Sequence, residues 1–210
     1  MERARIFFIH GLLRQSVAKI LMLVLLVVPV ILSACSAKMQ SDHMLNKDPK
    51  PPISINKNQA VLVIVRTTSW GSGYLINFYI DGKFIGQTLG KSYFITTVAP
   101  GARYLVADIW EGNMDKVRIN FDAGRVYFIN QLLYYAYPKA RIGFNPMTVE
   151  EAMKAVNDSE CGYRVYDVKK PGWDMSEEYF EKTKAEYEKD VKEFPSHYED
   201  ILKYRGYGKL

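Results

Sequence analysis

The chain has 210 residues, with 28 Lys and Arg against 23 Asp and Glu and a formal net charge of +5. Four of the basic residues and one acid lie within residues 1–34, so residues 35–210 carry 24 basic and 22 acidic side chains. This near balance excludes the basic footprint of a nucleic-acid-binding protein, and no nucleic-acid partner is expected.

Residues 1–34 have the pattern of a secretory signal peptide. Four basic residues precede residue 20, residues 20–31 carry no charge, and the small residues Ser33 and Ala34 stand directly before Cys35. A charged start, a short apolar run and a small-residue cleavage site define such peptides. The apolar run is shorter than the roughly 20 residues that a membrane-spanning helix needs.

The motif Leu32-Ser33-Ala34-Cys35 resembles the lipobox of bacterial lipoproteins, whose cysteine is acylated and becomes the mature N-terminus. The resemblance implies lipidation at Cys35 and attachment to a membrane through the lipid. It also implies the periplasmic side of the outer membrane, because an Asp after the cysteine retains such proteins in the inner membrane and this chain has Ser36 there. An ordinary signal peptide or an uncleaved anchor is the alternative. With Cys35 acylated, Cys161 has no disulfide partner, and a buried small hydrophobe is favoured over a reactive thiol.

Residues 35–58 have the composition of a flexible tether. They are rich in Lys, Asp, Ser and Asn, and Pro49, Pro51 and Pro52 favour an extended backbone over a helix. Such a tether allows the folded domain to stand clear of the membrane.

Residues 59–135 predict a mainly β domain. Residues 60–65 are continuously apolar, which indicates a strand covered on both faces. Asp81-Gly82 between two β-rich runs predicts a tight hairpin, and Pro100-Gly101 predicts another turn. The pattern predicts an antiparallel β-sandwich of about seven strands, placed at residues 60–65, 74–80, 83–86, 92–98, 102–110, 116–121 and 126–133.

A mixed extension, residues 136–172, and a charged helical extension, residues 173–210, are expected after the sandwich. Thr148 and Glu151 form a capping-box pattern before a helix to about Val156, and residues 163–168 suggest a further strand. Ser176 is the expected cap of a long helix that Pro195 ends and Ser196 restarts. Its apolar stripe is expected to pack on the sandwich rather than on another protein, and consists of Phe180, Tyr187, Val191 and Phe194.

The stretches 78–86 and 98–104 resemble PEGA-type β-sandwich domains. More closely, the chain is similar to small Gram-negative lipoproteins of an uncharacterised, domain-of-unknown-function family, with an apolar first strand leading to Arg66 and a Ser92-Tyr93-Phe94 strand. The chain departs from the PEGA pattern at residues 100–102, where no Glu separates Pro from Gly. The resemblance covers roughly residues 60–133 and implies a fold, but no activity and no catalytic residues.

The usual residues of an active site are missing from the predicted sandwich. His10, His43 and His197 all lie outside it, so a hydrolase has no local base and a zinc site lacks ligands. No phosphate-binding loop or dinucleotide motif is present, and no cofactor or metal is expected. Glu150 and Glu151 fit a helix N-terminus. Solvated turn acids are the favoured interpretation of the remaining candidate carboxylates, which are Asp108, Glu111 and Asp115.

A non-catalytic binding or assembly module is therefore the favoured function, with an enzyme acting on envelope polymer as the alternative. Antiparallel connections place the loop 67–73 and the turn at 110–113 at one end of a sandwich. Trp70 and Trp110 there are candidate ligand-binding residues for a glycan or an envelope protein. A structural role, in which both tryptophans cap the core, is the favoured alternative for these two side chains.

Overall fold

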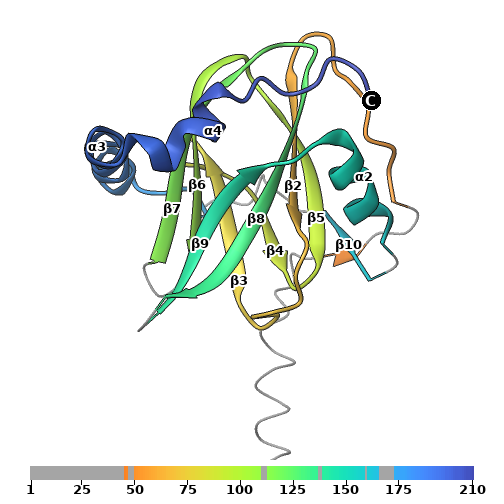
Figure 1. Ribbon diagram of the computed structural model, residues 1–210, viewed down its shortest axis with the longest axis horizontal. Helices are drawn as coiled ribbons and strands as arrows, with labels where there is room; N and C mark the ends of the chain where they lie inside the picture. Colours follow the sequence, from red (N-terminus) through yellow and green to blue (C-terminus); the bar gives the residue numbers. More distant parts are fainter. Residues whose placement is uncertain (1–44, 47–49, 110–112, 137–138, 159, 166–172) are drawn as a thin grey trace, which may run out of the picture. The chain divides into compact units, whose positions relative to one another are not determined.

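Two facing β-sheets with helices on their outer sides form the computed structural model of this protein (Figure 1). The structure describes residues 45–46, 50–109, 113–136, 139–158, 160–165 and 173–210, all within a compact unit that spans residues 43–210. Cys35 and the predicted signal peptide lie outside the described residues. No helix in the described part of the chain has both the length and the apolar character needed to cross a membrane.

The larger sheet has the strand order β1-β10-β5-β2-β8-β9. Its strands are β1 (Leu45–Asn46), β10 (Gly162–Val165), β5 (Ser92–Val98), β2 (Ala60–Arg66), β8 (Val126–Ala136) and β9 (Lys139–Pro146). The smaller sheet has the order β4-β3-β6-β7. Its strands are β4 (Lys83–Leu89), β3 (Leu75–Ile80), β6 (Gly101–Ile109) and β7 (Asn113–Phe121). The predicted mainly β sandwich is confirmed.

The main core lies between the two sheets, which approach each other at both edges. At one edge β4 lies beside β5, and at the other edge β7 lies beside β9. Alternate residues of the strands fill the space between the sheets because successive side chains of a strand point to opposite faces. The fully buried core residues include Leu62, Ile64, Phe78, Leu105, Phe121 and Tyr127.

Strand β2 is the central strand, and every one of its residues is buried. Leu62 and Ile64 face the other sheet, whereas Val61, Val63 and Val65 belong to a second core on the outer face. The continuous apolar run of the sequence is explained by this double coverage, as predicted.

Two strand pairs are parallel, which differs from the expected all-antiparallel arrangement. Val61 of β2 pairs with Val126 of β8, and Gly162 of β10 pairs with Ser92 of β5, both in parallel register. Between β2 and β8 the chain forms β5 of the larger sheet and all four strands of the smaller sheet, and β8 then enters the larger sheet in the same direction as β2.

The β3–β4 hairpin has the predicted two-residue turn. Ile80 pairs with Lys83, and Asp81 and Gly82 between them both have positive φ, at 48° and 77°. These backbone angles are those that a type I′ turn requires. The Asp81 carboxylate also accepts hydrogen bonds from the Tyr104 backbone N–H at 2.9 Å and from Arg103 at 3.1 Å, so it ties the turn to β6.

The sheet continues beyond residue 135, where the sequence predicted the end of the sandwich. Strand β9 pairs with β8 along its whole length, and β10 adds to the opposite side of the sheet. The predicted extension at 136–172 therefore supplies strands to the sandwich. Residues 166–168 of the predicted strand lie outside the described residues.

Helix α2 (Val149–Asn157) covers the outer face of β2 and starts with the predicted capping box. The Glu151 N–H donates to the Thr148 hydroxyl at 3.2 Å, and the Thr148 N–H donates to the Glu151 carboxylate at 2.9 Å. Ala152 and Val156 are its buried residues.

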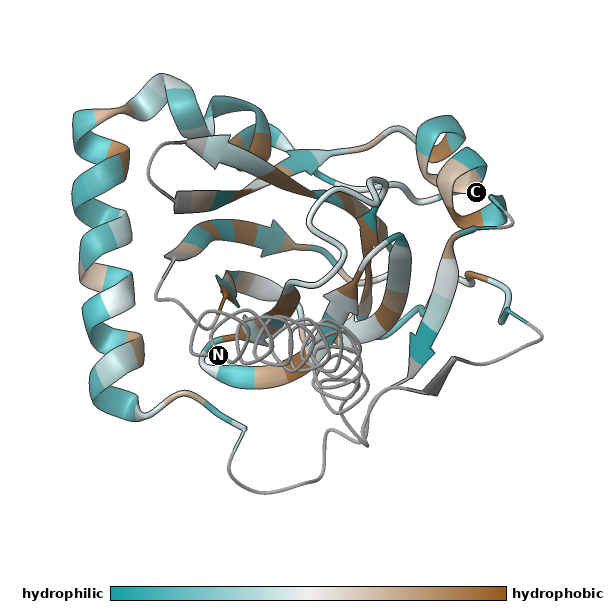
Figure 2. Ribbon diagram, turned by 90° about the horizontal axis from the view of Figure 1, so that it is seen from below, coloured by the Kyte–Doolittle hydropathy of each residue, from teal (hydrophilic) through white to brown (hydrophobic). Residues whose placement is uncertain are grey.

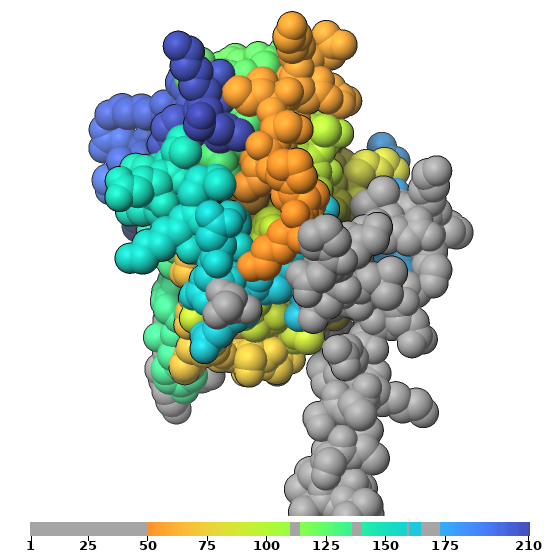
Figure 3. Space-filling model, turned by 90° about the vertical axis from the view of Figure 1, so that its right-hand side faces the viewer, coloured from red at the N-terminus to blue at the C-terminus, as the bar shows by residue number. Residues whose placement is uncertain are grey.

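The second half of the predicted tether is packed on the domain. Ile53 and Ile55 contact the second core, whereas Ser54 between them is exposed. Figure 3 shows this segment beside α2 on the surface of the molecule. The prediction of a free tether to residue 58 is therefore wrong, because the alternating isoleucines bury one side of an extended segment.

Helix α3 (Glu177–Glu193) begins at Ser176 as predicted, and its Tyr179 N–H donates to the Ser176 hydroxyl. Figure 2 shows it as a largely hydrophilic helix along one side of the sandwich. Tyr187 is buried against Tyr104, which confirms packing on the sandwich, but Phe194 is 57% exposed and does not take part.

The chain after Pro195 continues in two short helices. A 3₁₀ helix, η1 (Pro195–Tyr198), precedes α4 (Glu199–Lys203), so Ser196 lies inside η1 and does not cap the restarted helix. Tyr198 and Ile201 return to the main core.

Candidate binding site

Arg66 organises the end of the sandwich where β2 finishes. Its side chain is fully buried on the inner face of the larger sheet, and its guanidinium donates to three backbone carbonyls of the following loop. The distances are 2.9 Å to Tyr74 and Trp70 and 2.7 Å to Gly71. Burial lowers the pKa of Arg66 to about 10, so it remains charged at neutral pH. These hydrogen bonds hold the loop 67–74 against the end of the core.

Trp70 lies on this loop and is 48% exposed. The interpretation of Trp70 as a core cap, which the sequence favoured, is therefore wrong, because Arg66 rather than an aromatic ring fills the end of the core. Trp110 and Glu111 lie outside the described residues. Ile76 pairs with Ile109, so the loop before β3 and the turn after β6 leave the same end of the smaller sheet, as predicted.

Three tyrosines are exposed at the same end. Tyr74 belongs to the loop, and Tyr134 and Tyr135 lie on the β8–β9 hairpin, with exposed fractions of 36%, 46% and 62%. The last two were not predicted, because the last strand expected from the sequence ends at residue 133. The two consecutive tyrosines, shortly before Pro138, were the available signal.

A cleft of about 410 Å³ lies between α2 and the outer face of the larger sheet. It is lined by side chains with charges of both signs and by two carboxamides, and these include Thr67, Lys91, Asn130, Asn145, Met147, Glu151, Lys154, Asp158 and Cys161. Such a mixture of donors and acceptors suits a polar ligand. Sequence reasoning missed this cleft, since its walls come from elements far apart in the chain.

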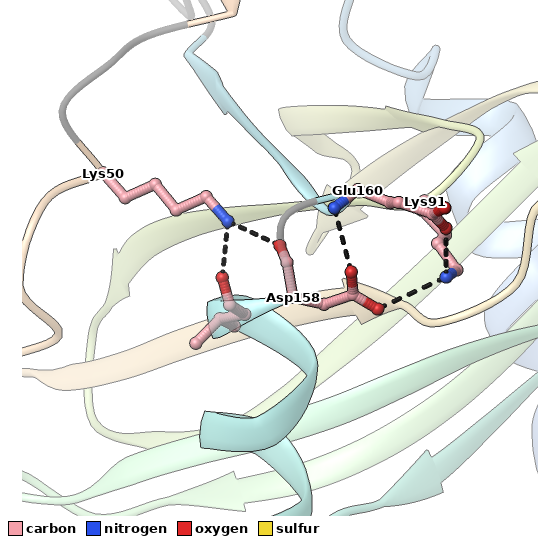
Figure 4. A network of polar contacts seen from close by, with 5 residues as sticks. Lys50, Lys91, Asp158 and Glu160 are labelled. Carbon is pink, nitrogen blue, oxygen red and sulfur yellow. Dashed lines mark hydrogen bonds and ion pairs between the residues drawn. The ribbon is translucent and has the colours of Figure 1, made fainter.

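One wall of the cleft is held by two lysines (Figure 4). Lys91 pairs with Asp158 at 3.3 Å and Glu160 at 2.7 Å, and Lys50 donates to the backbone carbonyls of Val156 and Asp158 at the end of α2. Hydrogen bonds from the Glu160 N–H and from Lys91 lower the pKa of Asp158. The wall is therefore fixed before any ligand arrives.

The cleft offers little for covalent chemistry. Cys161 is the free thiol in the described part of the chain, and it is 3% exposed. Burial raises the pKa of its thiol, so the nucleophilic thiolate is disfavoured. This agrees with the predicted role of Cys161 as a buried small residue.

A second, smaller groove of about 140 Å³ places Asp115 and His197 among its lining residues. Burial raises the pKa of Asp115 to about 6, against the opposing effects of the Lys116 N–H and of His197. Burial also raises the pKa of Asp108 to about 6, and its Oδ1 is buried with no hydrogen-bond partner among the described residues. The interpretation of these two acids as solvated turn residues is wrong, because both lie within strands that α3 or the following segments cover.

The described residues contain no group of three or more His, Cys, Asp or Glu side chains able to hold a metal ion. Glu150 and Glu151 lie at the N-terminus of α2, as expected.

No family model matches this chain. The chain is similar to an uncharacterized protein of Haemophilus influenzae, with 26% identity over 130 residues that make up 62% of this chain and 77% of the relative. The relative is distant and itself uncharacterised, so it supports membership in an uncharacterised group of proteins without assigning a function.

Proposed function

We propose that this chain is a lipid-anchored protein of the bacterial envelope, attached through Cys35 to the periplasmic side of the outer membrane, and that its sandwich is a non-catalytic binding module. The lipobox-like motif before Cys35 supports the anchor. The cleft beside α2 carries the binding part of the proposal.

The ligand that fits this cleft is a short polar segment of an envelope glycan or of a protein partner. Asn130 and Asn145 offer both donors and acceptors, and Lys154 forms no ion pair with any described residue. Thr67 and Asn130 are already joined at 3.3 Å across β2 and β8, which positions one amide in advance.

Co-sedimentation with purified peptidoglycan tests the binding role. Asn145→Ala with Lys154→Ala should weaken binding by roughly tenfold or more, because removing buried polar contacts of a ligand costs about 1–2 kcal/mol. Lys57→Ala, an exposed lysine on the docked 50–58 segment, is the matched control. Equal binding by both variants would show that the cleft is not the glycan site.

The anchor is tested separately by Cys35→Ser. Loss of the acyl group should move the domain from the membrane fraction to the soluble fraction. A substituted protein that stays membrane-bound with residues 1–34 attached would support an uncleaved signal anchor instead.

One observation favours catalysis on envelope polymer as the second candidate. Asp115, with its raised pKa, shares a groove with His197, and such a pair can act in acid–base chemistry. Hydrolysis of purified peptidoglycan that disappears in both Asp115→Asn and His197→Ala would establish this function. If the chain is the proposed binding module, we expect no hydrolysis of peptidoglycan in this assay.

A further inference from the structure

The floor of the cleft beside α2 is a row of polar side chains on the outer face of the larger sheet. Asn130 of β8 pairs with Asn145 of β9 on one side and with Val65 of β2 on the other. Thr67 follows β2 on the same face, since its hydroxyl donates to the Asn130 carboxamide oxygen at 3.3 Å. Lys91, directly before β5, also lines the cleft. Residues from four neighbouring strands therefore form one polar surface.

Helix α2 forms the opposite wall of the cleft. Glu151, Lys154, Ala155 and Asp158 line it, and their spacing of three and four residues places them on one side of the helix. The helix is held in place by its buried residues, Ala152 and Val156. The cleft thus lies between a polar row of the sheet and one polar face of a helix.

The carboxylates of the cleft already have partners, whereas two of its cations have no acidic partner. Glu151 is held by the capping box, and Asp158 pairs with Lys91 at 3.3 Å. Lys154 is exposed and forms no ion pair with any described residue. Arg66, at the edge of the cleft, donates to backbone carbonyls. A ligand with an anionic group complements this charge distribution.

The other lining residues favour a peptide over a sugar ring. Among the described residues, no aromatic side chain lines the cleft, so a saccharide has no ring face on which to stack. Asn130 and Asn145 each offer a donor and an acceptor, which match the C=O and N–H groups of a peptide bond. Met147 and Ala155 add apolar surface for a side chain. In peptidoglycan, the free carboxylates belong to the peptides, and the N-acetylated sugars carry no charge.

We propose that the cleft binds the peptide part of peptidoglycan, with a peptide carboxylate paired to Lys154 and peptide amides bonded to Asn130 and Asn145. This inference rests on the proposed function and names the ligand class of the same site. The glycan strand stays outside the cleft.

The test compares three probes with the full-length protein in detergent. The first is intact peptidoglycan, the second is glycan strands from which an amidase has removed the peptides, and the third is the released soluble peptides. The protein should sediment with the intact polymer and not with the peptide-free strands. The released peptides should compete with the intact polymer, whereas peptides whose carboxylates have been converted to methylamides should not.

Substitutions at Lys154 connect this binding to the cleft. Lys154→Gln should weaken binding to intact peptidoglycan roughly tenfold or more, because a charge-assisted hydrogen bond is lost. Lys154→Arg keeps the charge and should bind nearly as the parent does. Lys57→Gln, an exposed lysine on the docked 50–58 segment, is the matched control. Equal thermal unfolding of the variants and the parent checks that the fold is intact.

The outcomes separate this inference from the proposed function. Equal binding to intact polymer and to peptide-free strands, lost in Lys154→Gln, assigns the cleft to the sugar and overturns the inference alone. Equal competition by the methylamide peptides overturns the carboxylate pairing. Binding that neither Lys154→Gln nor Asn145→Ala weakens overturns the inference together with the cleft as the site of the proposed function. No binding to intact peptidoglycan overturns the inference and leaves a protein partner as the ligand of the proposed module.

Discussion

Arg66 is a buried charge whose hydrogen bonds to the described residues go to backbone carbonyls rather than to a carboxylate. A buried guanidinium normally carries a large desolvation cost unless its donors are satisfied. Here three carbonyls of one loop accept hydrogen bonds from its two terminal nitrogens, whereas Nε is buried with no hydrogen-bond partner among the described residues. The free energy of the interaction is therefore linked to the conformation of residues 70–74. The sequence showed an Arg at the end of the first strand, but not that its side chain faces inward.

Arg66→Met should lower the free energy of unfolding by about 2–4 kcal/mol, since it leaves three carbonyls without their donor. Arg66→Lys should cost less, because an ammonium group keeps the charge but cannot reproduce the planar geometry. Denaturant unfolding measures the effect, and hydrogen exchange of residues 70–75 should accelerate. Arg141→Met, at an exposed position, should change stability by less than about 0.5 kcal/mol.

Asp108 provides a pH-dependent contribution to stability. Its folded pKa of about 6 lies above the ordinary value of 3.8, so the folded state holds the proton more tightly than the unfolded state. The group therefore stabilises the fold below about pH 4, and this contribution is lost as the pH rises through 6. Among the described residues, Tyr79 and Tyr179 interact electrostatically with Asp108, and both stay neutral in this range.

Asp108→Asn should raise the free energy of unfolding at pH 7 by about 1–2 kcal/mol and leave it nearly unchanged at pH 4. Urea unfolding at several pH values measures the difference. Asp115 has a similarly raised pKa and should preserve part of the slope in the variant. A variant with the same pH dependence as the parent would show that Asp108 is not the titrating group.

At the scale of elements, the features that depend on neighbouring residues were predictable. The Asp81-Gly82 turn, the Thr148 capping box and the start of α3 each depend on side chains within four residues of one another. The parallel placement of β8, the pairing of β9 and β10, and the cleft beside α2 depend on contacts between distant segments. Periodicity carries no information on those contacts, so these features appeared only in the structure.

Gly82→Ala tests the hairpin as an element that also supports α3. The residue has a φ of 77°, and an added Cβ would lie 3.2 Å from the Phe180 ring. Backbone strain and this contact together should cost about 1–2 kcal/mol of stability. Gly73→Ala is the control, because its φ is ordinary and nothing lies within 4 Å of the added atom. Thermal unfolding of both variants should separate them by several degrees.

At the scale of the whole molecule, the docked segment 50–58 limits the length of chain that is free between the domain and the proposed anchor at Cys35. A tether that was free to residue 58 would reach about 80 Å when fully stretched, whereas the part before β1 reaches about 35 Å. The composition of the segment indicated disorder, but Ile53 and Ile55 bury one side of it against the core that α2 covers. Under the proposed anchor at Cys35, this shorter free segment would limit how far the domain can stand from the membrane.

Ile53→Ala with Ile55→Ala should lower the free energy of unfolding by about 1–3 kcal/mol, because both half-buried side chains lose apolar contact with the second core. Ser54→Ala, at the exposed position between them, should have almost no effect. The double variant should also make the bond between Lys57 and Asn58 more accessible to trypsin, because the segment that carries it is no longer held against the second core. Stability equal to that of the parent, together with unchanged trypsin resistance, would contradict the docked segment.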